Sequence, residues 1–216
     1  MIMQFSGFDI IQLILLLISL TVFIQKPVPL YLKLFPVYLF FGLIDIIVIE
    51  YLQSRGRFNT GVANSWGIIE FCFYFFVLRE LILNIKIKRV ILFVIFLFPV
   101  FALINLYLQK QVGFNPVNFT IGSLMTVSVC LYYFVELFQR ADSQSLTRLP
   151  AFWITTAILF NVVLTFPFFS FVSFMTKMPE LVLKNILAIF YVINILTSTL
   201  YSIGFLCRIR IRKSTL

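Results

Sequence analysis

Seven stretches of the chain are almost wholly apolar, and each is about long enough to cross the hydrocarbon core of a bilayer. Together they occupy most of the 216 residues. A soluble domain built from such segments would expose far more apolar surface than water tolerates. The sequence therefore predicts an integral membrane protein with a single transmembrane domain over residues 1–216.

The composition favours helices over a β-barrel as the form of these segments. Hydrophobic residues make up 62% of the chain, including 28 phenylalanines, and only 12% are charged. A membrane barrel needs segments of about ten residues that alternate between a lipid face and a polar lumen face. Here both faces of each segment are apolar, and a helix satisfies its own backbone hydrogen bonds in lipid. The expected fold class is an all-α polytopic bundle of seven transmembrane helices.

The expected spans follow the usual length of about 17 to 25 apolar residues per crossing. Their bounds are 10–24, 30–52, 62–83, 90–108, 117–138, 150–172 and 179–207. The first span is the shortest, but it lacks a basic leader and a small-residue cleavage site, and Asp9 precedes it. We expect it to be a retained helix and not a cleaved signal peptide.

Lysine and arginine residues predict the orientation, because positive charge near helix ends stays in the cytoplasm. If alternate connections lie on opposite sides, one side carries Lys26, Lys33, Lys86, Lys88, Arg89, Arg140, Arg148, Arg208, Arg210, Arg212 and Lys213. The other side carries Arg55, Arg57, Lys110, Lys177 and Lys184. The richer side is predicted to be cytoplasmic. The N-terminus then lies outside and the C-terminus inside, as an odd number of spans requires.

A membrane environment accounts for the net charge of +9. The basic residues follow the predicted helix ends, where anionic lipid headgroups lie. The lipid bilayer is the expected partner and nucleic acid is not. The expected location is the inner (plasma) membrane of the cell, as a multi-pass protein.

The chain contains no histidine. This excludes histidine-dependent nucleophiles, histidine haem ligands and most zinc sites. Cys72, Cys130 and Cys207 are far apart in the sequence, and the first two are interpreted as small core residues. There is no phosphate-binding loop, dinucleotide motif or zinc-protease motif. The protein is therefore not expected to be an enzyme or to hold a metal or a cofactor.

Two carboxylates, Asp45 and Glu70, fall inside predicted spans. Ionisable groups at membrane depth cost roughly 2.5 to 3.5 kcal/mol each on insertion scales and usually face the bundle interior. Counting about 1.5 Å per residue places both roughly 12 Å below the outer surface, on consecutive antiparallel helices. If they share a face, the pair is expected to hold a proton, a cation or a cationic ligand. The alternative is that each is neutral and hydrogen-bonded to a neighbouring helix.

Further polar residues extend the predicted pocket. Asn161 and Asn194 fall near the midplane of the last two spans, Tyr191 lies further out, and Asn64 precedes Glu70 on its span. Asparagine commonly joins helices through hydrogen bonds worth about 1 kcal/mol or less, so a packing role is the alternative. The predicted ligand or ion pocket consists of Asp45, Glu70, Asn64, Asn161, Asn194 and Tyr191.

A second group of charged residues lies at the predicted inner ends of the spans. Glu136 and Arg140 are spaced i,i+4, which favours a local ion pair. The alternative is a latch between helices in which Arg79 bridges to Glu136. The predicted inner-face contact residues are Arg79, Glu136, Arg208, Arg210 and Arg212.

The second half of the chain carries several short motifs. They are Tyr132-Tyr133 with Glu136-Leu137-Phe138, Pro150-Ala151-Phe152-Trp153-Ile154, Phe166-Pro167, and the tail from Phe205 to Lys213; the first half adds Asn64, Glu70-Phe71 and Tyr74. In these motifs the chain resembles small, functionally uncharacterised seven-helix membrane proteins of bacteria. Such proteins resemble companions of sensor kinases encoded nearby, so the resemblance implies a signalling role.

The expected function is a seven-helix sensory or regulatory membrane module. Its expected partner is a membrane-associated kinase or another membrane signalling protein. The alternative is a small-solute or proton-coupled transporter. In that alternative the carboxylates carry the coupling ion, and Pro36, Pro99 and Pro167 provide helix breaks.

Overall fold

The computed structural model describes residues 7–24, 27–56, 60–109, 114–139, 146–170 and 179–213. The α-helices are α1 (Gly7–Ser19), α2 (Leu30–Ser54), α3 (Thr60–Leu81), α4 (Ile85–Gln109), α5 (Pro116–Gln139), α6 (Pro150–Ser170) and α8 (Glu180–Lys213). Short 3-10 helices are η1 (Leu20–Ile24) and η2 (Leu146–Arg148). No strand occurs in these ranges, so the all-helical prediction is confirmed.

Six of these helices are long and apolar enough to cross a membrane. They are α2, α3, α4, α5, α6 and the Ala188–Cys207 part of α8. The first apolar helical segment, Asp9–Ile24, is shorter. A multi-pass membrane protein is therefore confirmed, while a seventh crossing by α1 and η1 stays a prediction. Each predicted span coincides with one described helix, with shifts of a few residues at most ends.

The outer surface of the bundle is apolar. On α4, Phe93 is 64% exposed and Phe96 70% exposed. A surface with such large exposed aromatic side chains suits contact with lipid chains and not with water. The bilayer is therefore the environment that this surface fits.

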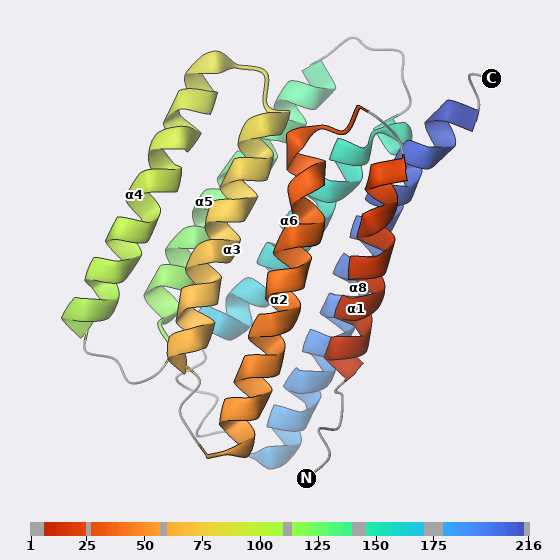
Figure 1. Ribbon diagram of the computed structural model, residues 1–216. Helices are drawn as coiled ribbons and strands as arrows, with labels where there is room; N and C mark the ends of the chain where they lie inside the picture. The colour runs from red at the N-terminus through yellow and green to blue at the C-terminus, as the bar shows by residue number, and fades with distance from the viewer. Residues whose placement is uncertain are drawn as a thin grey trace.

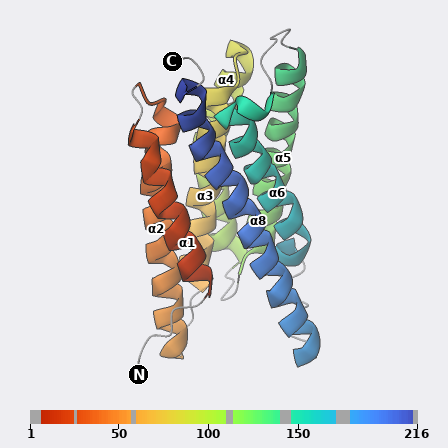
Figure 2. The same cartoon turned by 90° about the vertical axis from the view of Figure 1, so that its right-hand side faces the viewer.

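The helices form a closed ring with one helix outside it. Around the ring, each helix packs against the next in the order α3, α5, α6, α8, α1 and α2, and α2 returns to α3. Helices α3 and α6 also touch across the ring, whereas α4 packs mainly on the outer side of α3 (Figure 1). The second view shows α8 between α1 and α6 (Figure 2). The last helix in the chain thus closes the ring.

Consecutive helices run antiparallel along the bundle. Helices α1, α3, α5 and α8 finish at one end, and α2, α4 and α6 begin there (Figure 1). This end is called the basic end below, because Lys33, Arg79, Lys86, Lys88, Arg89 and Arg148 lie at or near it and the last turns of α8 carry Arg208, Arg210, Arg212 and Lys213. The arrangement agrees with the alternating connections used in the orientation argument.

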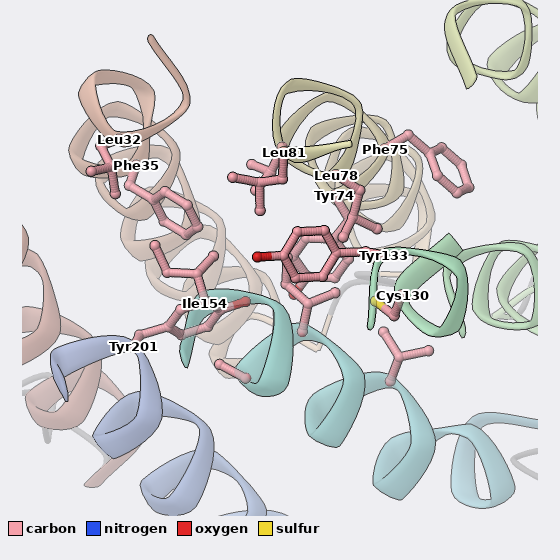
Figure 3. Packing of buried hydrophobic residues seen from close by; sticks show 14 of the residues in the cluster. Leu32, Phe35, Tyr74, Phe75, Leu78, Leu81, Cys130, Tyr133, Ile154 and Tyr201 are labelled. Carbon is pink, nitrogen blue, oxygen red and sulfur yellow. The ribbon is translucent and has the colours of Figure 1, made fainter. Parts of the chain in front are cut away.

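The half of the ring nearest the basic end is filled by large apolar side chains. This packed half is defined by six residues that are at most 1% exposed: Leu32, Phe35, Leu78, Ile154, Ile158 and Phe205. The ring of Phe35 lies 5.3 Å from that of Phe205 and 5.4 Å from that of Tyr201, centroid to centroid (Figure 3). Such contacts between α2 and α8 hold the ring closed at this depth.

Candidate functional site

A cavity of about 180 Å³ lies inside the ring, further from the basic end than the packed half. Residues of five helices line it: α1, α2, α3, α6 and α8. Its polar lining consists of Gln12, Tyr38, Trp66, Glu70, Tyr74, Asn161, Asn194, Thr197, Ser198 and Tyr201. It is called the Glu70 cavity below. A polar chamber of this size inside an apolar bundle is the strongest candidate for a site.

Glu70 is fixed in the cavity by two tyrosines. The Tyr74 hydroxyl donates to Glu70 Oε1 over 2.6 Å, and the Tyr38 hydroxyl donates to the same oxygen over 3.1 Å. Within the described residues, Oε2 of Glu70 has no hydrogen bond. The two phenols therefore orient the carboxyl group and leave one oxygen to face the cavity.

The hydrogen-bond network continues from α3 to α6. The side-chain amide of Asn161 donates to the Tyr74 hydroxyl over 3.0 Å. Tyr74 thus links Glu70 to Asn161 across the contact between the two helices. On α8, Ser198 Oγ donates to Asn194 Oδ1 over 3.5 Å, at the limit of a hydrogen bond. The polar groups of α8 that line the cavity are therefore less firmly bonded than those of α3 and α6.

Aromatic rings and one glycine shape the wall between α1, α2 and α3. Tyr38 and Trp66 stack with centroids 5.4 Å apart and an angle of 17° between their planes. A Cβ on Gly42 would lie 3.1 Å from Gln12 Nε2 and 3.1 Å from Trp66 Cζ2. The absence of a side chain at Gly42 thus leaves room for both neighbours.

Helical spacing explains why these residues meet. Trp66, Glu70 and Tyr74 follow one another at intervals of four, so they lie on one face of α3. On α8 the lining residues Asn194, Thr197, Ser198 and Tyr201 recur at intervals of three and four, as one helix face does. The same face of α8 continues toward the basic end with the fully buried Phe205. Each helix therefore passes from the cavity into the packed half along a single face.

Of the six predicted pocket residues, the structure brings Glu70, Asn161 and Asn194 together in the cavity. Asp45 does not line it. Asp45 is half-buried in an apolar groove between α2 and α3, beside Phe41 and Ile69. Tyr38 and Trp66 line both the groove and the cavity, so the stacked pair separates the two carboxylates.

Tyr191 also lies away from the cavity. It packs against the start of α1, where a Cβ on Gly7 would lie 2.6 Å from Tyr191 Cε2. Such a distance leaves no space for a side chain, so Gly7 permits a close approach of α1 and α8. Tyr191 is therefore placed at a helix contact and not in the Glu70 cavity.

Asn64 belongs to a separate cluster of asparagines away from the basic end. Its Oδ1 accepts the backbone N–H of Asn115 over 2.9 Å. Asn105 donates to Asn118 Oδ1 over 2.7 Å, and Asn118 donates to the carbonyl of Ala102 over 3.0 Å. Asn115 and Asn118 are 2% and 7% exposed. These bonds join α3, α4 and α5, which is the packing role that membrane asparagines commonly have.

At the basic end, Glu136 binds backbone and does not form the latch with Arg79. Its two oxygens accept the backbone N–H groups of Leu83 and Asn84, each over 2.9 Å. Arg79 pairs instead with Glu80 over 2.7 Å. Because a negative charge near a helix N-terminus is favourable, Glu136 on α5 stabilises the start of α4.

The remaining predicted contact residues are placed only by their backbone. Arg208, Arg210 and Arg212 lie on the last turns of α8, and the described part of the chain does not extend to their side chains. Arg140, the predicted i,i+4 partner of Glu136, lies outside the described residues. Helix α8 nevertheless continues unbroken from the cavity to these arginines.

Sequence reasoning missed much of the cavity lining. Tyr38, Trp66, Tyr74 and Gln12 were not predicted, although Trp66 and Tyr74 each lie one turn from Glu70 on α3. A signal was present in the sequence: Trp66 and Tyr74, which can both form hydrogen bonds, are spaced four residues before and after the intramembrane carboxylate of Glu70.

Comparisons of the chain with models of known protein families, with curated proteins and with solved structures gave no match.

Proposed function

We propose that the protein is a sensory or regulatory membrane module that binds a small ligand in the Glu70 cavity and passes the signal on by contact. The observation that carries this proposal is the continuity of α8. This single helix of 34 residues lines the cavity at Asn194 and Thr197 and ends in the sequence from Arg208 to Lys213. A shift of α8 at the cavity would therefore move its basic end.

The packed half supports transmission along the bundle. Between the cavity and the basic end, α8 contacts its neighbours through Phe205 and Gly204. A Cβ on Gly204 would lie 3.0 Å from Ile154 Cγ1, so α8 and α6 approach closely. Densely packed interiors transmit displacement because they deform little. A change at the cavity is thus coupled to the end of α8 through rigid contacts.

The proposed orientation places the basic end in the cytoplasm. It includes a seventh crossing by α1 and η1, an external N-terminus and a plasma-membrane location, all supported by the distribution of lysine and arginine. The basic end then faces the compartment of a membrane-associated kinase, the partner class implied by the resemblance to companions of sensor kinases. We place the binding role in the cavity and the contact role at Arg208, Arg210 and Arg212.

Gentle purification of the tagged protein from its native membrane, followed by quantitative mass spectrometry, tests this proposal. The matched variant replaces Arg208, Arg210 and Arg212 together by alanine. We expect a signalling protein at near-stoichiometric level with the wild-type protein, reduced at least fivefold with the variant. A wild-type protein that purifies alone and monodisperse, or equal capture by the variant, would contradict the contact role.

Transport is the second candidate, and one observation favours it. Helices α2 and α6 each contain a proline near a residue that lines the cavity, Pro36 before Tyr38 and Pro167 after Asn161. Both helices run unbroken through these prolines, and a proline beside a central site is a point at which a transporter helix could open. This alternative predicts substrate flux by the purified protein alone in liposomes. The regulatory proposal predicts none.

A further inference from the structure

The charge of the Glu70 cavity is unbalanced. Glu70 is the one acidic residue that lines it, and neither lysine nor arginine occurs among the lining residues in the described ranges. The two tyrosine hydroxyls occupy Oε1, and Oε2 faces the cavity without a hydrogen bond from a described residue. A carboxylate at membrane depth is costly unless it is protonated or paired with a cation. The site thus favours a ligand that brings positive charge.

Aromatic rings surround the same carboxylate. Tyr38, Trp66, Tyr74 and Tyr201 all line the cavity, and Tyr38 stacks on both Trp66 and Phe73, so its ring serves to hold Trp66 in place. The π face of such rings attracts weakly hydrated cations, above all ammonium groups that carry alkyl substituents. An aromatic wall beside a single carboxylate is therefore suited to an organic ammonium group.

Two buried hydroxyls in the cavity lack a protein partner. Thr197 Oγ1 and Tyr201 Oη have no hydrogen-bond partner among the described residues, although the residues are 7% and 4% exposed. Figure 3 shows the Tyr201 side chain reaching from α8 toward the middle of the ring. Buried polar groups are nearly always hydrogen-bonded in native structures. The Thr197 hydroxyl is therefore available to bond a polar atom of a ligand, whereas the Tyr201 hydroxyl lies beside that of Tyr74.

The size and donor set of the cavity argue against a bare metal ion. The volume of about 180 Å³ has room for several water molecules. Divalent ions such as Ca²⁺ require several oxygen ligands, usually including more than one carboxylate. No group of three or more histidine, cysteine, aspartate or glutamate side chains that could hold a metal occurs in the part of the chain that was described. An organic cation fits both the space and the single carboxylate.

We infer that the Glu70 cavity binds a small organic cation, a protonated or quaternary amine that also carries a hydroxyl group. Its ammonium group lies against Glu70 Oε2 and the aromatic lining formed by Trp66, Tyr74 and Tyr201. Its hydroxyl group reaches Thr197 on α8, so the ligand connects α3 to α8. This inference rests on the proposed binding role of the cavity and adds the chemical class of the ligand.

Tryptophan fluorescence provides a direct test. The chain has two tryptophans, and Trp153 lies near the basic end with its indole N–H donating to the carbonyl of Thr147. In a Trp153→Phe background all tryptophan emission comes from Trp66, which lines both the Glu70 cavity and the Asp45 groove, so variants of the two carboxylates assign the response to one of them. Titration of the purified protein with choline or tetramethylammonium should change the emission saturably. The neutral isostere 3,3-dimethyl-1-butanol, and sodium chloride at equal ionic strength, should not.

The two carboxylates supply a matched pair of variants. Glu70→Gln should weaken choline binding at least tenfold, whereas Asp45→Asn, outside the cavity at similar depth, should change it less than twofold. Choline should bind more tightly than tetramethylammonium, and Thr197→Val should reduce this difference. Equal responses to choline and its neutral isostere, or full-affinity binding to Glu70→Gln, would overturn the inference.

A second readout keeps the test independent of how well Glu70→Gln folds. A ligand that binds only the native state raises the unfolding temperature of the wild-type protein with increasing concentration. Choline should do so and 3,3-dimethyl-1-butanol should not. No saturable response to either ammonium probe in both assays would refute the inference. Partner capture would remain a separate test of the proposed function.

Discussion

The two halves of the ring contain similar helices and differ in how their interiors are filled. Toward the basic end, Phe35, Leu78, Ile154 and Phe205 are fully buried and interlock. At the depth of the cavity, Glu70 and the polar residues of α8 face an open space of about 180 Å³. Each of the helices α2, α3, α6 and α8 therefore has one half that is closely packed against its neighbours and one half that borders the cavity, where packing is incomplete.

This division follows from what holds membrane helices together. Lipid chains are as apolar as leucine, so burial in a bilayer supplies little hydrophobic stabilisation and close packing carries more of the association. The packed half supplies close packing, whereas the side chains that line the cavity lack van der Waals contacts on the side that faces the empty space. Stability is therefore expected to depend on the packed half, and binding on the cavity.

The largest effect is expected from truncating the same residue type in the two halves. Ile154 is fully buried in the packed half, and Ile46 lines the cavity. Ile154→Ala opens a void in dense packing and should cost about 2 to 5 kcal/mol. The unfolding temperature in detergent should then fall by roughly 5 to 15 °C. Ile46→Ala merely widens an existing space, so its decrease should be less than half as large. Equal decreases would contradict the division into halves.

A smaller effect is expected when a methyl group is added in each half. Gly204→Ala places a Cβ 3.0 Å from Ile154 Cγ1 and 3.4 Å from the Pro150 carbonyl oxygen. Overpacking costs about 1 to 3 kcal/mol and outweighs the gain of about 1 kcal/mol in helix propensity. At Gly42 an added Cβ meets Gln12 Nε2 and Trp66 Cζ2, each at 3.1 Å, and both side chains border the cavity, which leaves them room to move away. Thermal unfolding should therefore show a smaller loss of stability for Gly42→Ala than for Gly204→Ala.

The fold was largely predictable because each long helix is one apolar run. The predicted spans 30–52, 117–138 and 150–172 differ by at most two residues from α2, α5 and α6 at either end. The shorter α1 is the exception, since an apolar segment of its length fits either a crossing or a buried helix.

The candidate site was predictable only in part, because counting residues gives depth but not rotation about the helix axis. Glu70, Asn161 and Asn194 were identified as polar groups at depth, and all three line the cavity. Asp45 has a similar depth but faces the groove on the other side of Tyr38 and Trp66. Aromatic residues such as Tyr38 gave no signal of their own, since the same side chains also occur in ordinary helix contacts and at membrane interfaces.

The smallest effect on stability is expected from removing the hydroxyl of a buried threonine at two positions, one that lines the cavity and one that does not. Thr197 Oγ1 lines the cavity without a described partner, whereas Thr126 Oγ1, also buried, donates to the Gly122 carbonyl over 2.8 Å. Thr126→Val should cost about 0.5 to 1.5 kcal/mol, and Thr197→Val should cost nothing or stabilise the empty protein. Thermal unfolding without ligand measures both. A Thr197→Val protein as destabilised as Thr126→Val would show that the Thr197 hydroxyl supports the fold. An unchanged one would show that this group is available for a ligand.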